Sequence, residues 1–114
     1  MVSADPKQGD PYTFVDNTPP LPGLVIRREV IDRFGISQAD LARLTRISKV
    51  RISLIINGHN PMSAEVALRL GQVTKTDPAY WIDLQSRFNL YQKSRALRQT
   101  LEKLVTVDAY ARKV

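Results

Sequence analysis

Cysteine is absent from this 114-residue sequence, and histidine occurs once, at His59. Without cysteine the chain has no disulfide, no zinc–thiolate site and no thiol nucleophile. A single histidine cannot form a histidine-cluster metal site, and no helical pair of carboxylates suggests a two-metal nuclease or a glycosidase. We therefore expect no enzymatic activity, no metal and no cofactor.

Long apolar runs and an export signal are also missing. No run approaches the roughly 18 apolar residues that a membrane span needs, and residues 1–6 have neither the basic nor the apolar segment of a signal peptide. We expect a cytoplasmic protein without a membrane partner. With 43% hydrophobic and 25% charged residues, the length suits one soluble domain with tails.

Acidic residues are scarce in the middle of the chain. The sequence holds 17 Lys and Arg against 11 Asp and Glu, which gives a net charge of +6. No acid lies between Asp40 and Glu65, whereas four bases do: Arg43, Arg46, Lys49 and Arg51. Such an excess attracts polyanions, so nucleic acid is the leading class of partner.

Prolines are concentrated in residues 1–22, which hold five of the seven. This composition predicts an extended N-terminal arm. The arm also carries Tyr12, Phe14 and Val15, an apolar cluster that a purely solvated linker would not need. We expect the cluster to pack on its own domain or on a partner.

From residue 23 the apolar periodicity becomes helical. It predicts an all-α domain of five helices, at 23–34, 38–45, 49–56, 64–75 and 78 to about 104. Ser37, Ser48, Ser63 and Asp77 are good N-caps for the last four, and Pro78 suits a first helical position. We divide the chain into the arm, a helical domain at 23–91 and a C-terminal helical extension at 92–114.

The last predicted helix carries an apolar stripe. Trp81 begins it and indicates core or dimer packing, and we assign Trp81 to a dimer interface. Leucines follow at near-heptad spacing, at Leu90, Leu97, Leu101 and Leu104. This spacing favours a homodimer held by the C-terminal helix.

The helix at 49–56 is the candidate binding element. On a wheel of about 100° per residue, its three isoleucines face inward. The outward residues are Lys49, Val50, Arg51, Ser53 and Leu54. A short capped helix after a tight turn, with such a mixed face, is typical of a helix-turn-helix recognition helix. Arg51 can bond guanine, Lys49 guanine or phosphate, and Val50 a thymine methyl, whereas Gln38 can bond phosphate.

The spacing of these residues resembles the Xre/lambda-repressor helix-turn-helix family. The residues that carry the likeness are Gly35-Ile36-Ser37-Gln38-Ala39-Asp40-Leu41-Ala42, Ile47-Ser48, Arg51-Ile52-Ser53 and Ile55-Ile56-Asn57-Gly58. Four further stretches resemble the HigA antitoxin subfamily: Pro22-Gly23, Asn60-Pro61-Met62-Ser63, Ala67-Leu68-Arg69-Leu70 and Asp77-Pro78-Ala79-Tyr80-Trp81-Ile82-Asp83-Leu84-Gln85. The likeness covers about 22–91.

This resemblance implies a five-helix domain that binds double-stranded operator DNA as a homodimer. It also implies an antitoxin that represses its own operon and neutralises a HigB-like ribonuclease toxin, which cleaves messenger RNA. The implied DNA-binding residues are Gln38, Arg46, Ser48, Lys49, Val50, Arg51, Ser53, Leu54, Asn57 and His59. Arg46 stands where the family has a turn glycine, and Val50 and Leu54 depart from its usual polar residues. The toxin-binding candidates are Tyr12, Phe14 and Val15.

Two other functions stay open at this point. A stand-alone Xre-type repressor would share the DNA-binding face but lack a toxin partner. A protein-interaction module would keep the fold and lose DNA binding, which the apolar Val50 and Leu54 make conceivable. The bases from Arg43 to Arg51 favour DNA, and the segment 77–85 favours the antitoxin.

Overall fold

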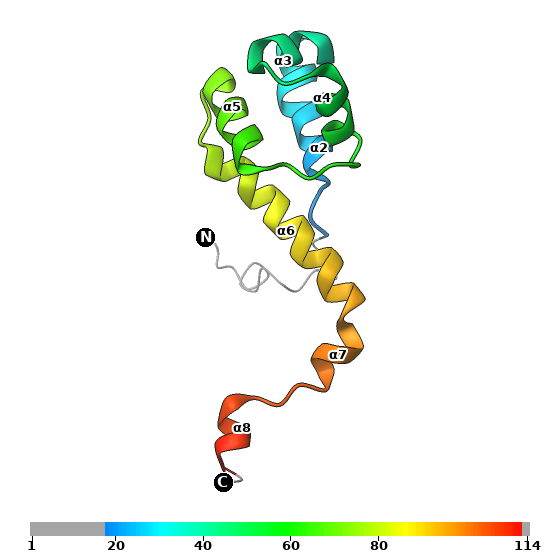
Figure 1. Ribbon diagram of the computed structural model, residues 1–114, viewed down its shortest axis with the longest axis vertical. Coiled ribbons are helices and arrows are strands. Elements are labelled where there is room, and N and C mark those ends of the chain that lie inside the picture. Colours follow the sequence, from blue (N-terminus) through cyan, green and yellow to red (C-terminus); the bar gives the residue numbers. More distant parts are fainter. Residues whose placement is uncertain (1–17, 113–114) are drawn as a thin grey trace.

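The computed structural model describes residues 18–112, and Tyr12, Phe14 and Val15 lie outside this range. Every regular element within it is helical, which confirms the predicted all-α class. The helices are α2 (Pro22–Ile26), η1 (Arg27–Asp32), α3 (Gln38–Thr45), α4 (Lys49–Ile56), α5 (Ala64–Thr74), α6 (Pro78–Ala96), α7 (Arg98–Glu102) and α8 (Val107–Arg112). Helices α2 to α5 form a compact head, and α6 leads away from it (Figure 1).

The first predicted helix is not regular. Its second half, η1, is a π-helix that runs on from α2 without a break in backbone conformation, and Gly35 ends the helical stretch with φ +65°. Val30 and Ile31 are buried as expected, whereas Phe34, expected on the same face, is 57% exposed. A π-helix closes i→i+5 hydrogen bonds, so the residues after it are rotated away from the face that an α-helical wheel predicts.

Caps fix the bounds of the next helices. The Ser37 hydroxyl accepts a hydrogen bond from the Asp40 N–H at 3.0 Å, and the Asp40 carboxylate accepts one from the Ser37 N–H at 2.9 Å. This reciprocal capping box starts α3 at the predicted residue. Ser48 caps α4 with a single bond, since its hydroxyl accepts from the Arg51 N–H at 3.1 Å and no reciprocal bond is formed. Both helices have the predicted bounds, 38–45 and 49–56.

The core lies inside the head, between α2, η1, α3, α4, α5 and the start of α6. It contains fifteen buried apolar residues, from Val25 to Trp81. Trp81 is 1% exposed, and its Nε1 donates to Thr76 Oγ1 at 2.8 Å. The assignment of Trp81 to a dimer interface is therefore wrong, because this side chain already fills the core of its own chain.

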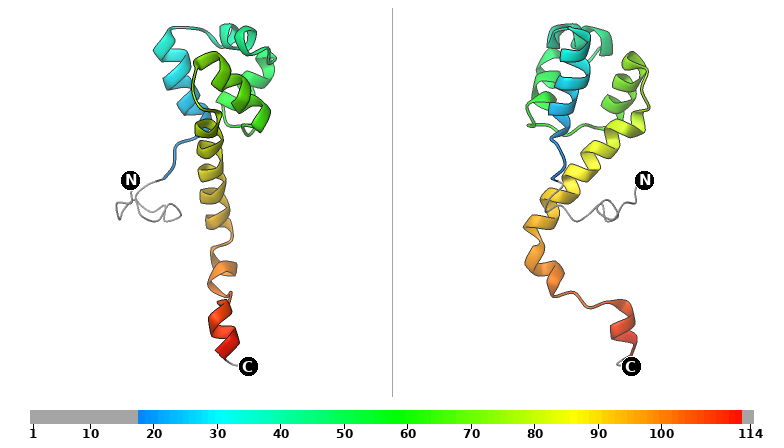
Figure 2. Two further views of the ribbon diagram at one scale, coloured as in Figure 1. Left: turned by 90° about the vertical axis from the view of Figure 1, so that its left-hand side faces the viewer. Right: turned by 180° about the vertical axis from the view of Figure 1, so that it is seen from behind.

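The C-terminal part is not the single helix that the sequence predicts. Helix α6 ends at Ala96, and the shorter α7 and α8 follow with no buried residue (Figures 1 and 2). No proline or glycine marks the break at Leu97. None of the residues beyond it packs on the head, so only local interactions hold these helices. One of these interactions is a hydrogen bond at the start of α8, in which the Thr106 hydroxyl accepts from the Ala109 N–H at 3.3 Å.

Candidate nucleic-acid interface

The turn between α3 and α4 is held in a left-handed conformation. Arg46 has φ 59° and ψ 35°, and its N–H donates to the Ala42 carbonyl. Ile47 donates to the same carbonyl at 3.2 Å and is buried beneath the turn. This geometry turns the chain within three residues, and the Arg46 side chain is left in solvent.

The N-terminal half of α4 presents a small surface that combines basic and apolar groups. Lys49 is exposed, and Val50 is 71% exposed. Arg51 is half-buried, and its Nη2 lies 3.4 Å from Ser63 Oγ at the start of α5. A contact at this distance is weak, so the guanidinium can leave it for a stronger acceptor.

Leu54 does not share this surface fully. It is half-buried, whereas the wheel placed it outward with Val50. At this end of α4 the chain turns back, since the N–H groups of His59 and Asn60 donate to the Leu54 carbonyl at 2.8 and 3.2 Å. Val50 is therefore the one large apolar side chain that α4 exposes.

The predicted contact residues fall into two groups. Arg46, Ser48, Lys49, Val50 and Arg51 gather at the turn and the first helical turn of α4. Asn57 and His59 are exposed at the other end, about 12 Å along the axis at 1.5 Å per residue. Ser53 is half-buried, and its hydroxyl accepts from Asn57 Nδ2 at 3.3 Å.

Helix α3 supplies fewer free cations than its sequence suggests. Gln38 is half-buried in the first turn, beside N–H groups that a helix leaves free. Arg43 forms an ion pair with Asp40. The pKa of the Asp40 carboxyl is lowered, first by the hydrogen bonds from the Ser37 backbone and hydroxyl and then by Arg43. Within the described part of the chain no ion pair to Arg46 or Lys49 is found, so these are the bases nearest the turn that stay available.

One contributor to this site was missed. Arg69 of α5 donates from Nη1 to the Thr45 carbonyl at 2.9 Å and to the Arg46 carbonyl at 3.4 Å. Its only signal in the sequence was its place in a family-like stretch, because a contact across 24 residues leaves no local pattern.

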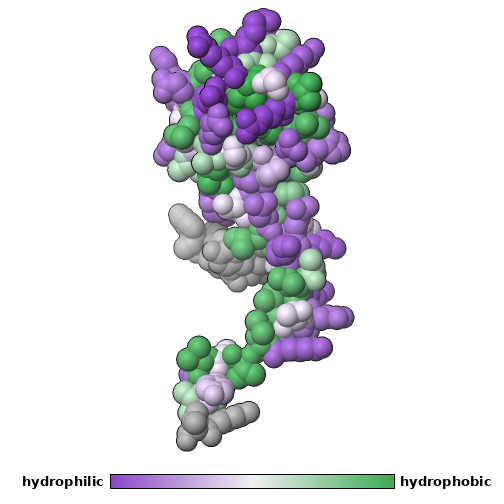
Figure 3. Space-filling view, viewed as in Figure 1, coloured by the Kyte–Doolittle hydropathy of each residue, from purple (hydrophilic) through white to green (hydrophobic). Residues whose placement is uncertain are grey.

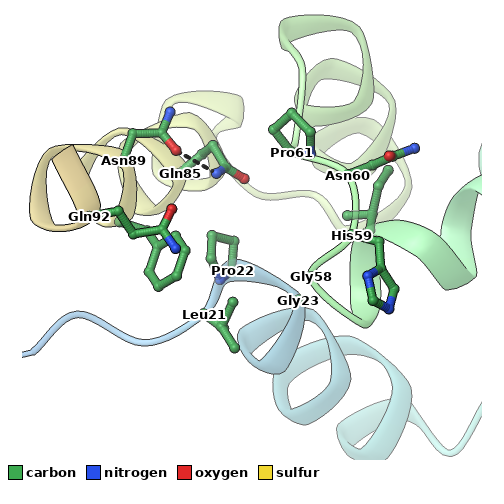
Figure 4. Close-up of a pocket in the computed structure, with 12 residues that line it drawn as sticks. Leu21, Pro22, Gly23, Gly58, His59, Asn60, Pro61, Gln85, Asn89 and Gln92 are labelled. Atoms are coloured by element: carbon green, nitrogen blue, oxygen red, sulfur yellow. Dashed lines mark hydrogen bonds between the residues drawn. The ribbon is translucent and has the colours of Figure 1, made fainter. Parts of the chain in front are cut away.

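A cleft of about 200 Å³ lies away from these residues, between the start of α2, the α4–α5 connection and α6 (Figure 4). One of its amide side chains, Gln85, forms hydrogen bonds within the chain. Gln85 Oε1 accepts from the Met62 N–H at 2.7 Å, and Gln85 Nε2 donates to Asn89 Oδ1 at 3.0 Å. His59 and Asn60 form its rim. Gln85 thus links α6 to the α4–α5 connection at the floor of the cleft, and this use within the chain argues against a ligand-binding role for it.

The leucines proposed for dimerisation are exposed. The exposed fraction is 44% for Leu90, 40% for Leu97, 46% for Leu101 and 65% for Leu104. In Figure 3 hydrophobic and hydrophilic groups lie on opposite edges of the segment around α7. Among residues 18–112, none covers this apolar edge.

Between residues 18 and 112 no group of three histidines or acids could hold a metal ion. No helix in that range is long and apolar enough to cross a membrane. The groups exposed around the α3–α4 turn are basic side chains, a hydroxyl and the apolar side chain of Val50.

Comparison with known proteins gives consistent results. A family profile described as "Helix-turn-helix" matches residues 27–81. "Virulence-associated protein A'" from Dichelobacter nodosus is 36% identical over 75 residues, which span 65% of this chain and 64% of that protein.

Two solved structures are similar over nearly their whole length. Antitoxin HigA of Pseudomonas aeruginosa, solved with the higBA promoter, is 31% identical with a TM-score of 0.73, over 78% of this chain and 97% of that one. An addiction module antidote protein of a HigA family from Coxiella burnetii is 30% identical with a TM-score of 0.72, over 77% of this chain and 96% of that one.

Proposed function

Because the chain belongs to the HigA family of helix-turn-helix proteins, we propose that it is the antitoxin of a type II toxin–antitoxin module. It binds its own operator as a homodimer and represses transcription, and it neutralises an mRNA-cleaving, HigB-like toxin by direct binding. The observation that carries the proposal is the surface formed by Arg46, Lys49 and Val50 at a capped helix N-terminus. Such residues suit phosphate, base edges and thymine methyls.

Arg51 provides the first test. Its guanidinium leaves Ser63 and forms a bidentate pair with a guanine, so Arg51→Ala costs about 1–3 kcal/mol of operator binding and relaxes sequence preference. Gel shifts at fixed salt compare the operator upstream of the gene with a scrambled duplex. Arg87→Ala on α6 removes a base that is ion-paired with Asp83, away from α4, and is the matched control. Equal, small losses on both duplexes would make Arg51 a phosphate contact instead.

The homodimer rests on the exposed leucines of the C-terminal segment. Truncation after Tyr91 removes Leu97, Leu101 and Leu104 and leaves the buried core intact, since that core ends at Trp81. We expect a monomer in light scattering and weaker operator binding, because two-fold symmetry doubles the half-site contacts. A dimer that survives truncation would move the interface to α5, to Leu90 or to the first half of α6.

The toxin binds away from α4, so that one chain holds toxin and operator together. The candidate surface is the arm, where Tyr12, Phe14 and Val15 stand in an acidic segment suited to a basic ribonuclease. Deleting residues 1–20 then abolishes co-purification of the ribonuclease encoded next to the gene, while operator binding is retained. Unchanged co-purification would assign the toxin to the outer face of α2 and α6.

The alternative is a stand-alone repressor of the same family. Several similar proteins are described only as HTH-type transcriptional regulators, such as YbaQ of Escherichia coli, which is 27% identical over 93 residues. A full-length chain that binds its operator and retains no ribonuclease from its own operon would establish this alternative.

A further inference from the structure

The α3–α4 turn is tied to α5 by one side chain. The Arg69 guanidinium donates to the carbonyls of Thr45 and Arg46 on one edge. On its other edge, Nε and Nη2 each lie 3.0 Å from Glu65 Oε2, an acceptor one turn earlier on α5. Both edges of the planar group are thus fixed, which a lysine ammonium could not reproduce.

The acceptors on the turn need such a partner. Thr45 ends α3, and no N–H group of the helix donates to the carbonyls of its last turn. Arg46 adds strain, because a non-glycine residue at φ 59° costs about 1–2 kcal/mol. The turn is therefore a place where the backbone would relax if nothing held it.

The direction of α4 follows from this turn. Only Ile47 and Ser48 separate Arg46 from Lys49, the first residue of α4. A change in the backbone of Arg46 therefore moves the N-terminal end of α4, where the proposed base-reading residues lie. Base contacts tolerate little displacement, whereas contacts to phosphate depend mainly on charge.

We infer that Arg69 is a positioning residue for DNA recognition: it clamps the α3–α4 turn from α5 and so sets the sequence specificity of α4 without touching a base. The inference rests on the proposed DNA-binding function. It predicts a loss of discrimination between sequences rather than a loss of binding to DNA in general.

The test uses the full-length protein and a duplex that the wild type selects from a random-sequence library. We compare binding to this duplex and to a scrambled one at fixed salt. Arg69→Met keeps the aliphatic stem and removes the clamp, so the ratio of the two affinities falls about tenfold, the size of one lost base contact. Arg69→Lys keeps the positive charge but not the planar guanidinium, so its affinity ratio lies between those of Arg69→Met and the wild type. Arg87→Met, which breaks a similar i,i+4 pair with Asp83 on α6, leaves the ratio unchanged.

A second substitution separates positioning from general stability. Glycine adopts a left-handed conformation without strain, so Arg46→Gly added to Arg69→Met lets the turn keep its shape without the clamp and restores the ratio. Loss of folded protein lowers both affinities equally and leaves the ratio unchanged. If Arg69→Met does not fold, Glu65→Gln weakens the other edge and gives a smaller fall in the ratio.

A wild-type ratio in Arg69→Met, or a fall that Arg46→Gly does not recover, would overturn the inference. Failure of the proposed function looks different, since the wild-type protein itself would then select no sequence from the library.

Discussion

Substituting glycine for Arg46 should stabilise the fold and weaken DNA binding at the same time. Arg46 has φ 59° and an exposed side chain, and no ion pair to it is found within residues 18–112. The left-handed conformation costs a non-glycine residue about 1–2 kcal/mol. Glycine in turn lowers the stability by about 0.5–1 kcal/mol, because it loses more conformational entropy on folding than a residue with a side chain. The difference is a net gain of about 0.5–1 kcal/mol.

Lys75 offers a matched control within the same chain. It ends α5 with φ 57°, so Lys75→Gly removes one positive charge and relieves the same strain away from the α3–α4 turn. A gain of about 1 kcal/mol in a domain of this size raises Tm by about 4–8 °C. Thermal unfolding should therefore show a similar rise for both variants.

Operator binding should distinguish the two substitutions. If Arg46 contacts a phosphate, Arg46→Gly lowers the slope of log affinity against log salt by about 1, whereas Lys75→Gly leaves the slope unchanged. The measurement is a salt titration of operator binding by fluorescence anisotropy. Equal slopes would refute the phosphate contact. A rise in Tm for Lys75→Gly alone would show that the Arg46 side chain already offsets its backbone strain.

Three further predictions concern stability. Gly23→Ala should lower the free energy of unfolding in urea by about 3 kcal/mol, because the new Cβ would lie 2.2 Å from the Ile56 carbonyl oxygen. A Cβ at Gly35 meets nothing within 4 Å, but Gly35 has φ +65°, so Gly35→Ala should lower it by about 1 kcal/mol. Equal losses would contradict the close packing of α2 on α4. The pKa of Asp40 is lower in the folded protein than in the unfolded chain, so its carboxylate stabilises the fold above the unfolded pKa, and this stabilisation is lost as the pH falls through the folded pKa. Asp40→Asn should therefore flatten the acid side of the pH–stability curve. Burial and the bond to Glu29 raise the pKa of Tyr80, so stability should fall above pH 10 in the wild type and less in Tyr80→Phe, as followed by circular dichroism.

The sequence was sufficient wherever structure is set by neighbours along the chain. The bounds of α3 and α4 follow from Ser37, Asp40 and Ser48, since a cap acts within three residues. The resemblance places a turn glycine at Arg46, and the structure gives Arg46 the left-handed conformation that favours glycine. The three isoleucines predicted the inward face of α4, and all three are buried.

The failures concern what distant parts of the chain do. The Arg69 clamp joins α5 to a turn more than 20 residues earlier, and no local rule indicates such a contact. Trp81 fits a dimer stripe as well as a core, and only the packed head decides between them. The break at Leu97 has no breaker residue, and the π-helical turn of η1 moved Phe34 off a face that periodicity assigned to it.

The exposed C-terminal segment gives the molecule an unusual shape. Its radius of gyration is 17.9 Å, against about 13 Å for a compact domain of this size. Helices α7 and α8 bury no side chain, so in a single chain their amide hydrogens should exchange with solvent nearly as fast as those of a free peptide. No residue between 18 and 112 buries this segment, so slow exchange there would point to a cover from outside that range. If protection of these two helices rises with protein concentration, amide exchange in them measures the fraction of chains that are assembled, while the amides of the head remain protected in either state.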